Sequence, residues 1–183
     1  MNKFRDIKLL SVNNEKSLID DAYIILQNNL GKNYIDFDSF WFYVKNNQVL
    51  VSINKKEIVG VLIIELTTQE NFFNKYNIKG NVNNCRILNI QTIAVKYYKQ
   101  GIGTALINYC ISNYSKYVNI IFTPLWKSIS GTNASRLFQK FGFIPFTIIN
   151  NFWYKDSLGK EGYCPICGSP CTCSVVIYYK VVN

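Results

Sequence analysis

Two short segments of the chain contain residues whose types and spacing could do chemistry, and the first is a pair of closely spaced glycines. The segment Gln100-Gly101-Ile102-Gly103-Thr104 joins an apolar stretch to a predicted helix. The first turn of a helix has backbone N–H groups without internal partners, and its dipole favours negative charge. Because glycines let phosphates approach the backbone, the segment predicts an anion site, although a plain tight turn would use the same residues.

Two familiar phosphate-binding loops fit this segment poorly. A P-loop has Gly-Lys-Ser/Thr at its end, whereas Gly103 is followed by Thr104 and Ala105. The dinucleotide-binding fingerprint has a third glycine where this chain has Leu106. Lys96 and Lys99 lie just before the glycines and add positive charge.

The second segment is a cluster of cysteines near the C-terminus: Cys164, Cys167, Cys171 and Cys173. Cys-Pro-x-Cys-Gly is typical of a zinc-knuckle turn, and the last two cysteines, two residues apart at the start of a predicted strand, would share one face. We predict that these thiolates hold one structural Zn²⁺ and close a long loop. Disulfides and an iron–sulfur cluster are the alternatives.

The composition limits the classes of protein and of mechanism. At 183 residues, with 49% hydrophobic and 17% charged, the chain is expected to form one folded domain over residues 1–183. No apolar run could cross a bilayer and no signal peptide is evident, so we predict a cytoplasmic protein without a membrane partner. The chain has no histidine, which excludes imidazole chemistry, and Cys85 and Cys110 are interpreted as structural residues.

The formal charge of +9 suits an anionic partner, such as a nucleic acid, an acidic protein or a phosphate-bearing cofactor. Near the cysteines, however, Lys155 and Lys160 are offset by Asp156 and Glu161. A structural role for the cysteine loop is therefore favoured over nucleic-acid binding.

Hydrophobic periodicity predicts a mixed α/β domain around these two segments. The expected helices are 18–30, 37–45, 102–114 and 133–141, and the polar segment 69–84 is expected to be a loop. The expected strands are 6–12, 48–54, 58–68, 85–95, 118–125, 143–154 and 174–182. The cysteine cluster falls between the last two strands.

Two motifs in this order resemble the GNAT superfamily of acetyltransferases. The first is the apolar strand end Ile93-Ala94-Val95 followed by Gly101-Ile102-Gly103. The second, running from Ala134 to Phe143, is similar to the family's Ala-x-x-Leu-Tyr-x-x-x-Gly-Phe helix end. The resemblance covers nearly the whole chain. It implies a largely antiparallel sheet flanked by helices, with a zinc-knuckle insertion that the cysteines add.

By resemblance, the chain is expected to move an acetyl group from acetyl-CoA to a primary amine. Backbone N–H groups near Ile93, Ala94 and Val95 would polarise the thioester, and the glycine segment would bind the cofactor. Asn133 is similar to residues that touch the pantetheine arm, although asparagine also suits a helix cap. The acceptor could be a small molecule, a peptide or a protein lysine, and a homodimer stays open.

Three positions depart from the family pattern. Tyr98 stands where the cofactor motif has Gln or Arg, Phe138 where the family has a proton-donating tyrosine, and Gln91 where a strand glutamate is usual. Tyr98 is compatible with phosphate held by backbone N–H groups. The other two departures raise the alternative of a non-catalytic acyl-CoA sensor.

The general base and general acid must therefore come from elsewhere. Glu65, within an apolar strand, is the predicted base, although strand alternation could also expose it to solvent. The loop carboxylates Glu70, Asp36 and Asp38 are alternatives, as is a chain of waters with no dedicated base. For the acid we predict Tyr179, with Tyr154 and Tyr178 as the other tyrosines of the final strands.

Overall fold

Strands β2 (Val49–Asn54) and β3 (Glu57–Thr68) form the hairpin that their β-branched residues predict. The turn between them places Lys55 and Lys56 at φ 49° and 71°. Both residues thus have the positive φ of the tight turns that match strand twist. The computed structural model describes residues 6–11, 13–32, 34–81, 84–128, 131–132, 134–159 and 164–182, and only the backbone at 131 and 132.

One sheet contains all the described strands, in the order β1-β2-β3-β4-β5-β8-β7, with β6 paired to β5. Among these strands the β4–β5 pair is parallel and every other pair is antiparallel. The remaining strand bounds are β1 Asp6–Leu10, β4 Arg86–Val95, β5 Ile120–Ser128, β6 Gly131–Thr132, β7 Ile144–Ile149 and β8 Ser174–Val181.

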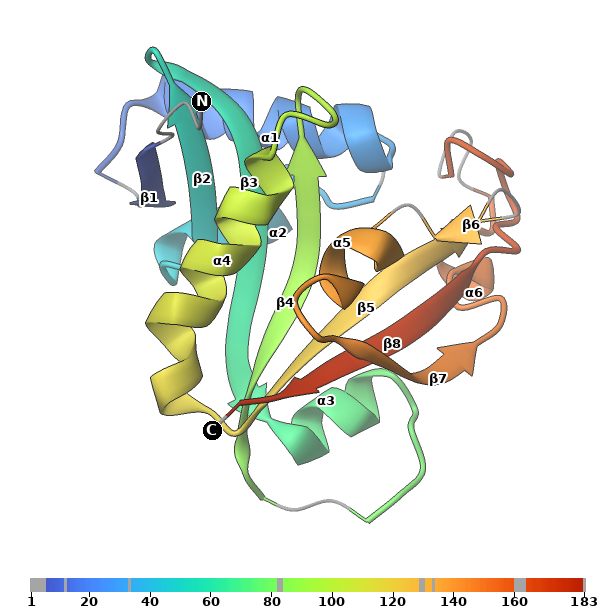
Figure 1. The fold of residues 1–183 in the computed structure, drawn as a ribbon. Helices are drawn as coiled ribbons and strands as arrows, with labels where there is room; N and C mark the ends of the chain where they lie inside the picture. Colours follow the sequence, from blue (N-terminus) through green and yellow to red (C-terminus); the bar gives the residue numbers. More distant parts are fainter. Residues whose placement is uncertain are drawn as a thin grey trace.

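Helices cover both faces of this sheet (Figure 1). Helix α4 crosses the front of β2, β3 and β4, whereas α1 and α2 lie behind them (Figure 1). The helices are α1 Lys16–Leu30, α2 Phe37–Lys45, α3 Gln69–Lys75, α4 Ile102–Tyr114, α5 Ser135–Gln139 and α6 Tyr154–Ser157, with a 3-10 turn η1 at Ser115–Tyr117.

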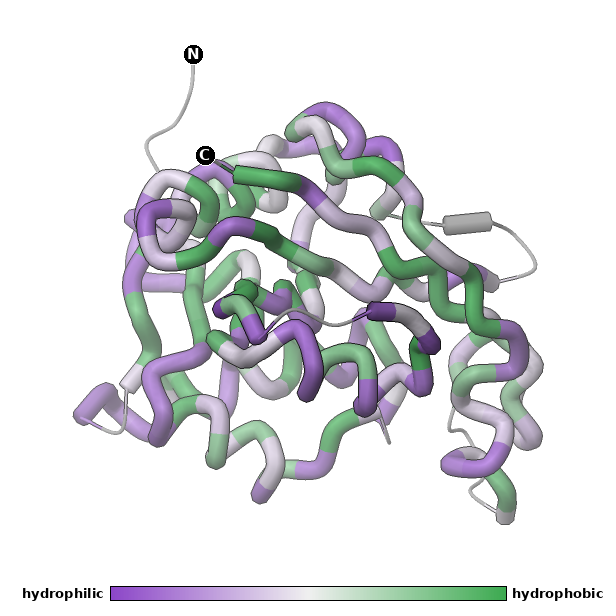
Figure 2. The backbone as a smooth tube through the Cα atoms, turned by 90° about the horizontal axis from the view of Figure 1, so that it is seen from below, coloured by the Kyte–Doolittle hydropathy of each residue, from purple (hydrophilic) through white to green (hydrophobic). Residues whose placement is uncertain are grey.

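The core has a separate hydrophobic cluster on each side of the sheet. Leu106 and Cys110 of α4 pack with Leu88 and Ile90 of β4 on one face. Helices α1 and α2 pack against the other face of β2 and β3, and α3 packs against Phe122 on that same side. Hydrophobic and hydrophilic stretches follow one another along the chain (Figure 2), and most residues of β2 and β3 are buried on both faces of the sheet. Burial raises the pKa of Cys110 to about 12, which fits the structural interpretation of this thiol.

Two sequence-based expectations are wrong in detail. The segment expected to be a loop begins with helix α3, whose cap is Thr68, which accepts a hydrogen bond from the N–H of Asn71 at 3.2 Å. Only seven residues long, this helix is too short to show a clear period, yet it buries Phe72 and Phe73. The strand expected to reach Tyr154 ends at Ile149, because the chain turns at Asn151 (φ 51°) into α6.

The fold class predicted from sequence is confirmed. The chain is a single α/β domain with a mostly antiparallel open sheet, and the cysteine cluster lies between β7 and β8. In the part of the chain that the structure describes, no helix has the length and apolar character needed to cross a membrane.

Candidate functional site

Strands β4 and β5 pair at one end and separate at the other (Figure 1). Their pairing runs only from Ile87, opposite Ile120, to Asn89, opposite Phe122. Beyond it the hydroxyl of Thr123 donates a hydrogen bond to the carbonyl of Ile90 at 3.0 Å. The two strands diverge from this point, so the sheet is open between them.

A bulge in β4 lies at the start of this opening. Ile63 pairs with Thr92 and Ile64 with Ile90, which leaves Gln91 as an extra residue on β4. A bulge bends and twists a strand and redirects the extra side chain. Gln91 lines the opening for this reason.

A cleft of about 740 Å³ fills the space between the separated strands. Its lining comes from both faces of the sheet. Ile102 and Leu137 belong to the hydrophobic cluster under α4, whereas Tyr76 and Trp153 belong to the cluster beside α3. The cleft therefore connects the two faces. We call its two parts the glycine end (Lys99, Gly101, Gly103, Arg136, Lys140) and the aromatic end (Tyr34, Tyr76, Trp126, Phe152, Trp153).

At the glycine end, helix α4 directs its N-terminus into the cleft. Gly101 precedes the helix in the left-handed conformation (φ 75°), which glycine adopts without strain. Its carbonyl accepts the N–H of Ala105 at 3.0 Å, so the N–H groups of Ile102, Gly103 and Thr104 form the first turn. The segment predicted to bind an anion thus opens into the cleft. Of its five residues from Gln100 to Thr104, all except Gln100 line the cleft.

Gly103 also lies close against α5. A Cβ atom there would lie 2.8 Å from Cδ2 of Leu137 on α5 and 3.5 Å from Cδ1 of Ile93. Because Gly103 has no side chain, α5 can lie close to α4, and nothing protrudes over the first turn of α4 at this position. Arg136 of α5 and Lys140, the residue that follows this helix, join Lys99 in lining this end, which makes it positively charged.

The edge of β4 that faces the opening has backbone N–H groups available for a ligand. The N–H of Lys96 donates to the carbonyl of Val59 on β3 at 2.9 Å. Since backbone groups alternate between the two edges of a strand, the N–H groups of Ile93 and Val95 are directed toward the side that β5 has left. Ala94 lines the cleft as well, but its N–H is directed toward β3.

Tyr98, which departs from the family pattern, connects the loop to α1. Its hydroxyl donates a hydrogen bond to Oδ1 of Asn29 at 2.7 Å, and both residues line the cleft. Asn133, the other predicted cofactor residue, lies outside the described residues.

A polar network extends from the aromatic end to the back of β3 and β4. Oε1 of Gln91 accepts hydrogen bonds from Asn89 Nδ2 at 2.9 Å and Lys75 Nζ at 3.1 Å, with the hydroxyl of Tyr76 at 3.5 Å. Tyr34, also hydrogen bonded to Gln91, lines the cleft beside it. Burial raises the pKa values of Tyr34 and Tyr76, so both hydroxyls stay protonated and can donate hydrogen bonds.

Glu65, the predicted base, lies at the far end of this network and does not line the cleft. Its carboxylate accepts from Asn89 Nδ2 at 3.2 Å and pairs with Lys75 Nζ at 3.4 Å. The side chain is 31% exposed, so it is neither fully buried nor an ordinary surface glutamate. Any proton transfer to it has to pass through water or through the network.

The predicted acid, Tyr179, is not part of the cleft lining. Its ring packs against Phe122 and Phe146, with centroids 6.1 and 5.9 Å apart. Phe138 is fully buried and makes an edge contact with Phe143 at 5.1 Å. The hydroxyls that reach the aromatic end belong to Tyr34 and Tyr76, which the sequence did not indicate because only the fold brings them to β4.

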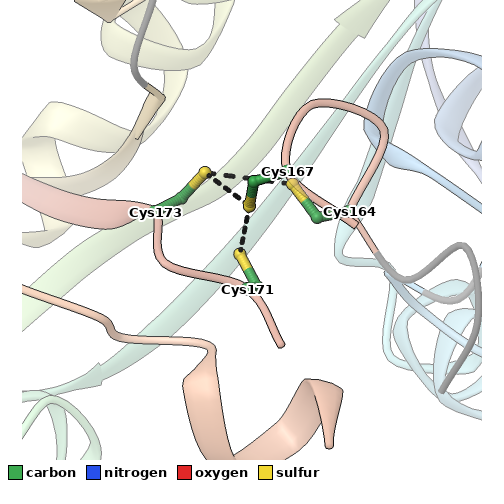
Figure 3. A group of neighbouring side chains, drawn as sticks. All are labelled: Cys164, Cys167, Cys171 and Cys173. Atoms are coloured by element: carbon green, nitrogen blue, oxygen red, sulfur yellow. Dashed lines mark hydrogen bonds between the residues drawn. The ribbon is translucent and has the colours of Figure 1, made fainter. Parts of the chain in front are cut away.

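The four cysteines converge as predicted (Figure 3). Their sulfur atoms all lie within 4.8 Å of one another. The sulfur of Cys167 is 3.5 Å from those of Cys171 and Cys173, and Cys164 is 3.9 Å from Cys173. A tetrahedral zinc ion with Zn–S bonds of about 2.3 Å has sulfurs about 3.8 Å apart, so the group fits such an ion.

The pKa values of these thiols differ within the cluster. Burial raises the pKa of Cys173 to about 11 despite a hydrogen bond from the indole of Trp126. For Cys167 burial opposes ionisation, but hydrogen bonds from the Thr172 backbone and the other thiols lower the pKa to about 7. Four thiolates can coexist here only beside a positive ion, which supplies the charge that water cannot.

Helix α6 fixes this loop from the other side. Oγ of Ser157, which is fully buried, accepts the N–H of Cys171 at 2.7 Å and donates to the carbonyl of Tyr154 at 2.9 Å. Cys164 and Cys171 also line the cleft. The cysteine cluster is therefore part of the wall at the aromatic end.

Comparison with solved structures identifies the fold. Arabidopsis thaliana NAA60 in complex with acetyl-CoA has a TM-score of 0.72 at 14% identity, covering 98% of this chain and 99% of that chain. The ribosomal-protein-S18-alanine N-acetyltransferase from Escherichia coli has a TM-score of 0.66 at 16% identity, covering 98% and 95%. The IAA acetyltransferase from Bacillus cereus gives 0.64 at 16% identity, covering 98% and 100%.

No protein-family model matches the chain, and a search of curated proteins found no significant match. The structure neighbours are GNAT acetyltransferases, so the fold is of the GNAT type, as the two sequence motifs predicted. At 12–16% identity this likeness concerns the fold alone.

Proposed function

We propose that this chain, as one domain over residues 1–183, is an N-acetyltransferase that moves an acetyl group from acetyl-CoA to a primary amine. The observation that carries this proposal is the N-terminus of α4, which opens through Gly101 and Gly103 into a cleft between separated strands. The likeness to acetyltransferase folds, one of them solved with acetyl-CoA, supports the same donor.

The proposed cofactor site uses mainly backbone groups. The N–H groups of the segment from Gln100 to Thr104 would hold the pyrophosphate, with Lys99, Arg136 and Lys140 adding positive charge. The pantetheine arm would lie between β4 and β5, along Ile93 to Val95 and beside Asn133. The N–H groups directed toward the opening, on Ile93 and Val95, would polarise the thioester carbonyl.

The reaction needs few groups. The lone pair of a neutral amine attacks the thioester carbonyl carbon, the C–N bond forms, and the C–S bond breaks as the CoA thiolate leaves. The amine loses one proton, which we assign through water to Glu65, and the CoA thiolate gains one from water. Tyr34 and Tyr76 are placed to donate hydrogen bonds near the departing sulfur, whereas Tyr179 would need another route.

We further propose that Cys164, Cys167, Cys171 and Cys173 hold a Zn²⁺ ion with a structural role. The sulfur spacing and the thiol set fit this ion. A closed set of four protein ligands leaves no position for a substrate, so the ion would fix the loop and supply no chemistry to the transfer.

Thermal shift and product formation test the enzyme proposal together. Acetyl-CoA at about 100 times its Kd should raise Tm by about 5–10 °C for a chain of this size. Free CoA should then appear only when an amine is added. CoA has to be measured by chromatography, because thiol reagents would also react with the six cysteines. No Tm shift with acetyl-CoA would contradict the proposed cofactor site.

A non-catalytic acyl-CoA sensor is the second candidate, because Phe138 is buried and Glu65 lies outside the cleft. A sensor would show the same Tm shift. It would release no CoA with any amine of a broad panel, which distinguishes it from the enzyme.

A further inference from the structure

The aromatic end of the cleft is built from rings that come from distant parts of the chain. Phe152 stacks on Tyr76 with centroids 5.4 Å apart, and Trp153 meets Phe152 edge-on at 5.0 Å. Trp126, from the end of β5, and Tyr34, from the segment between α1 and α2, complete the lining. Five aromatic side chains thus line the part of the cleft that an acceptor would meet beyond the thioester.

These rings are held in place by contacts behind them. The indole of Trp126 donates a hydrogen bond to the sulfur of Cys173, and both tryptophans pack against the cysteine cluster. Tyr76 is fixed by Phe72, whose ring centroid lies 4.7 Å away, and its hydroxyl bonds Gln91. A wall fixed in this way is formed before the ligand arrives, which lowers the entropic cost of binding.

The charges along the cleft differ between its ends. Among its described lining residues, none is an aspartate or a glutamate, and the cations Lys99, Arg136 and Lys140 come from the α4–α5 side. A second ammonium group on an acceptor would find no carboxylate partner here and would lose its hydration. An apolar or aromatic body would instead bury surface against the rings, and tryptophan faces also attract a single ammonium group.

We propose that the acceptor is a primary amine on an aromatic or bulky apolar body, and that Trp126 and Trp153 determine this specificity. This inference rests on the proposed acetyltransferase function. The cysteine cluster positions the two tryptophans and does not touch the reacting atoms.

Three small amines test the class of acceptor. We expect kcat/KM for phenethylamine to be at least tenfold above n-butylamine, and n-butylamine to be at least tenfold above putrescine, its analogue with a second ammonium group. The same order should hold for Kd values measured by calorimetry on the protein–CoA complex, a readout that needs no turnover. Putrescine equal to or better than phenethylamine would overturn the proposal.

Substitutions test the two residues. Trp153→Leu should raise the KM for phenethylamine about tenfold and leave the KM for acetyl-CoA within twofold. The matched control is Trp41→Leu on α2, whose ring stacks on Phe37 at 6.3 Å outside the cleft and which should change neither value. Trp126→Phe keeps a ring but removes the N–H donor, so it should raise the amine KM less than Trp126→Leu.

A second variant covers the case in which Trp153→Leu disturbs the cysteine loop. Phe152→Leu removes a lining ring that is not among the residues packed on the cysteines, and it should also raise the amine KM severalfold. Unchanged amine KM values in Phe152→Leu and in a metal-loaded Trp153→Leu protein would refute the assignment.

Further measurements distinguish a peptide acceptor from a free amine. They also distinguish failure of this inference from failure of the acetyltransferase proposal. The peptide Phe-Gly-Gly-Gly presents a primary amine beside an aromatic side chain, and Gly-Gly-Gly-Gly is its control without the ring. The kcat/KM for Phe-Gly-Gly-Gly relative to phenethylamine distinguishes a peptide acceptor from a free amine. Turnover of putrescine, but of no amine that carries an aromatic ring, would refute this inference and leave the acetyltransferase proposal intact. Failure of acetyl-CoA to bind would sink both.

Discussion

The two ends of the cleft are built in different ways. The backbone of the glycine end comes from one continuous segment, in which β4 passes through Gly101 into α4, and the α5 region adds the cations Arg136 and Lys140. The aromatic end combines the α1–α2 connection, α3, β5 and the segment after β7. Backbone groups form the binding surface of the first, and side chains form that of the second.

This difference predicts unequal consequences for the departures from the family pattern. Replacing Gln or Arg by Tyr98 leaves the backbone N–H groups of the first helical turn unchanged. Replacing polar groups by Gln91 and Phe138 changes the side chains that would move protons. A cofactor held by backbone tolerates substitution, whereas the acceptor and the chemistry depend on which side chains the fold brings together.

The largest effect is expected from a substitution in the cysteine cluster that supports the aromatic end. Cys167→Ser should abolish stoichiometric metal binding and lower Tm by about 10 °C, since about 1 kcal/mol corresponds to 2–4 °C in a chain of this size. It should raise the amine KM more than the acetyl-CoA KM. Cys85→Ser, a half-buried thiol outside the cluster, is the control. Metal-free, fully stable wild-type protein, measured by elemental analysis and thermal melting, would contradict the structural role of zinc.

The next largest effect tests whether Glu65, in the polar network behind the aromatic end, acts as the general base. Glu65→Gln should lower kcat about 100-fold with an unchanged KM for acetyl-CoA, because general base catalysis contributes at least that factor. Glu70→Gln, on the exposed first turn of α3, is the control. A kcat within threefold of the wild type would show that Glu65 only anchors Lys75.

A smaller effect is expected at the glycine end. Thr104→Glu adds a negative charge to the first turn of α4, where it repels the pyrophosphate but favours the helix dipole. We expect the Kd for CoA to rise at least tenfold while Tm of the free protein stays equal or increases. Thr104→Gln has nearly the same shape without the charge and should bind CoA within threefold of the wild type. Equal binding by both variants would mean that the phosphates lie elsewhere.

The smallest effect concerns the cap of α2. The carboxylate of Asp36 caps α2 by accepting the N–H and hydroxyl of Ser39 at 2.7 and 2.9 Å, and these bonds lower its pKa. Asp36→Ala should cost about 1 kcal/mol. Because the folded pKa is depressed, the contribution is present above the unfolded value of about 3.9 and decreases as pH falls through the folded value. Denaturant melts at pH 7 and pH 2.5 would check that the difference shrinks.

The features that could be predicted from sequence are local ones. The turn at Gly101 and Gly103 was predictable because it depends on backbone geometry over a few residues, and the convergence of the cysteines because of their spacing. Helix α3 was missed because seven polar and aromatic residues show no period until Phe72 and Phe73 meet Phe122. Tyr34 and Tyr76 gave no local signal, since nothing near them in sequence distinguishes them from the other tyrosines.

The sequence by itself determined the α/β class, the glycine turn that opens α4 and the convergence of four thiols, because each follows from short-range geometry and hydrophobic period. Only the tertiary structure decided that Glu65 lies outside the cleft and that Tyr179 packs against Phe122. It alone also brought Trp126 and Trp153 together beside the cysteines. These contacts join residues far apart in the chain, and long-range side-chain packing leaves no periodic pattern in the sequence that could predict it.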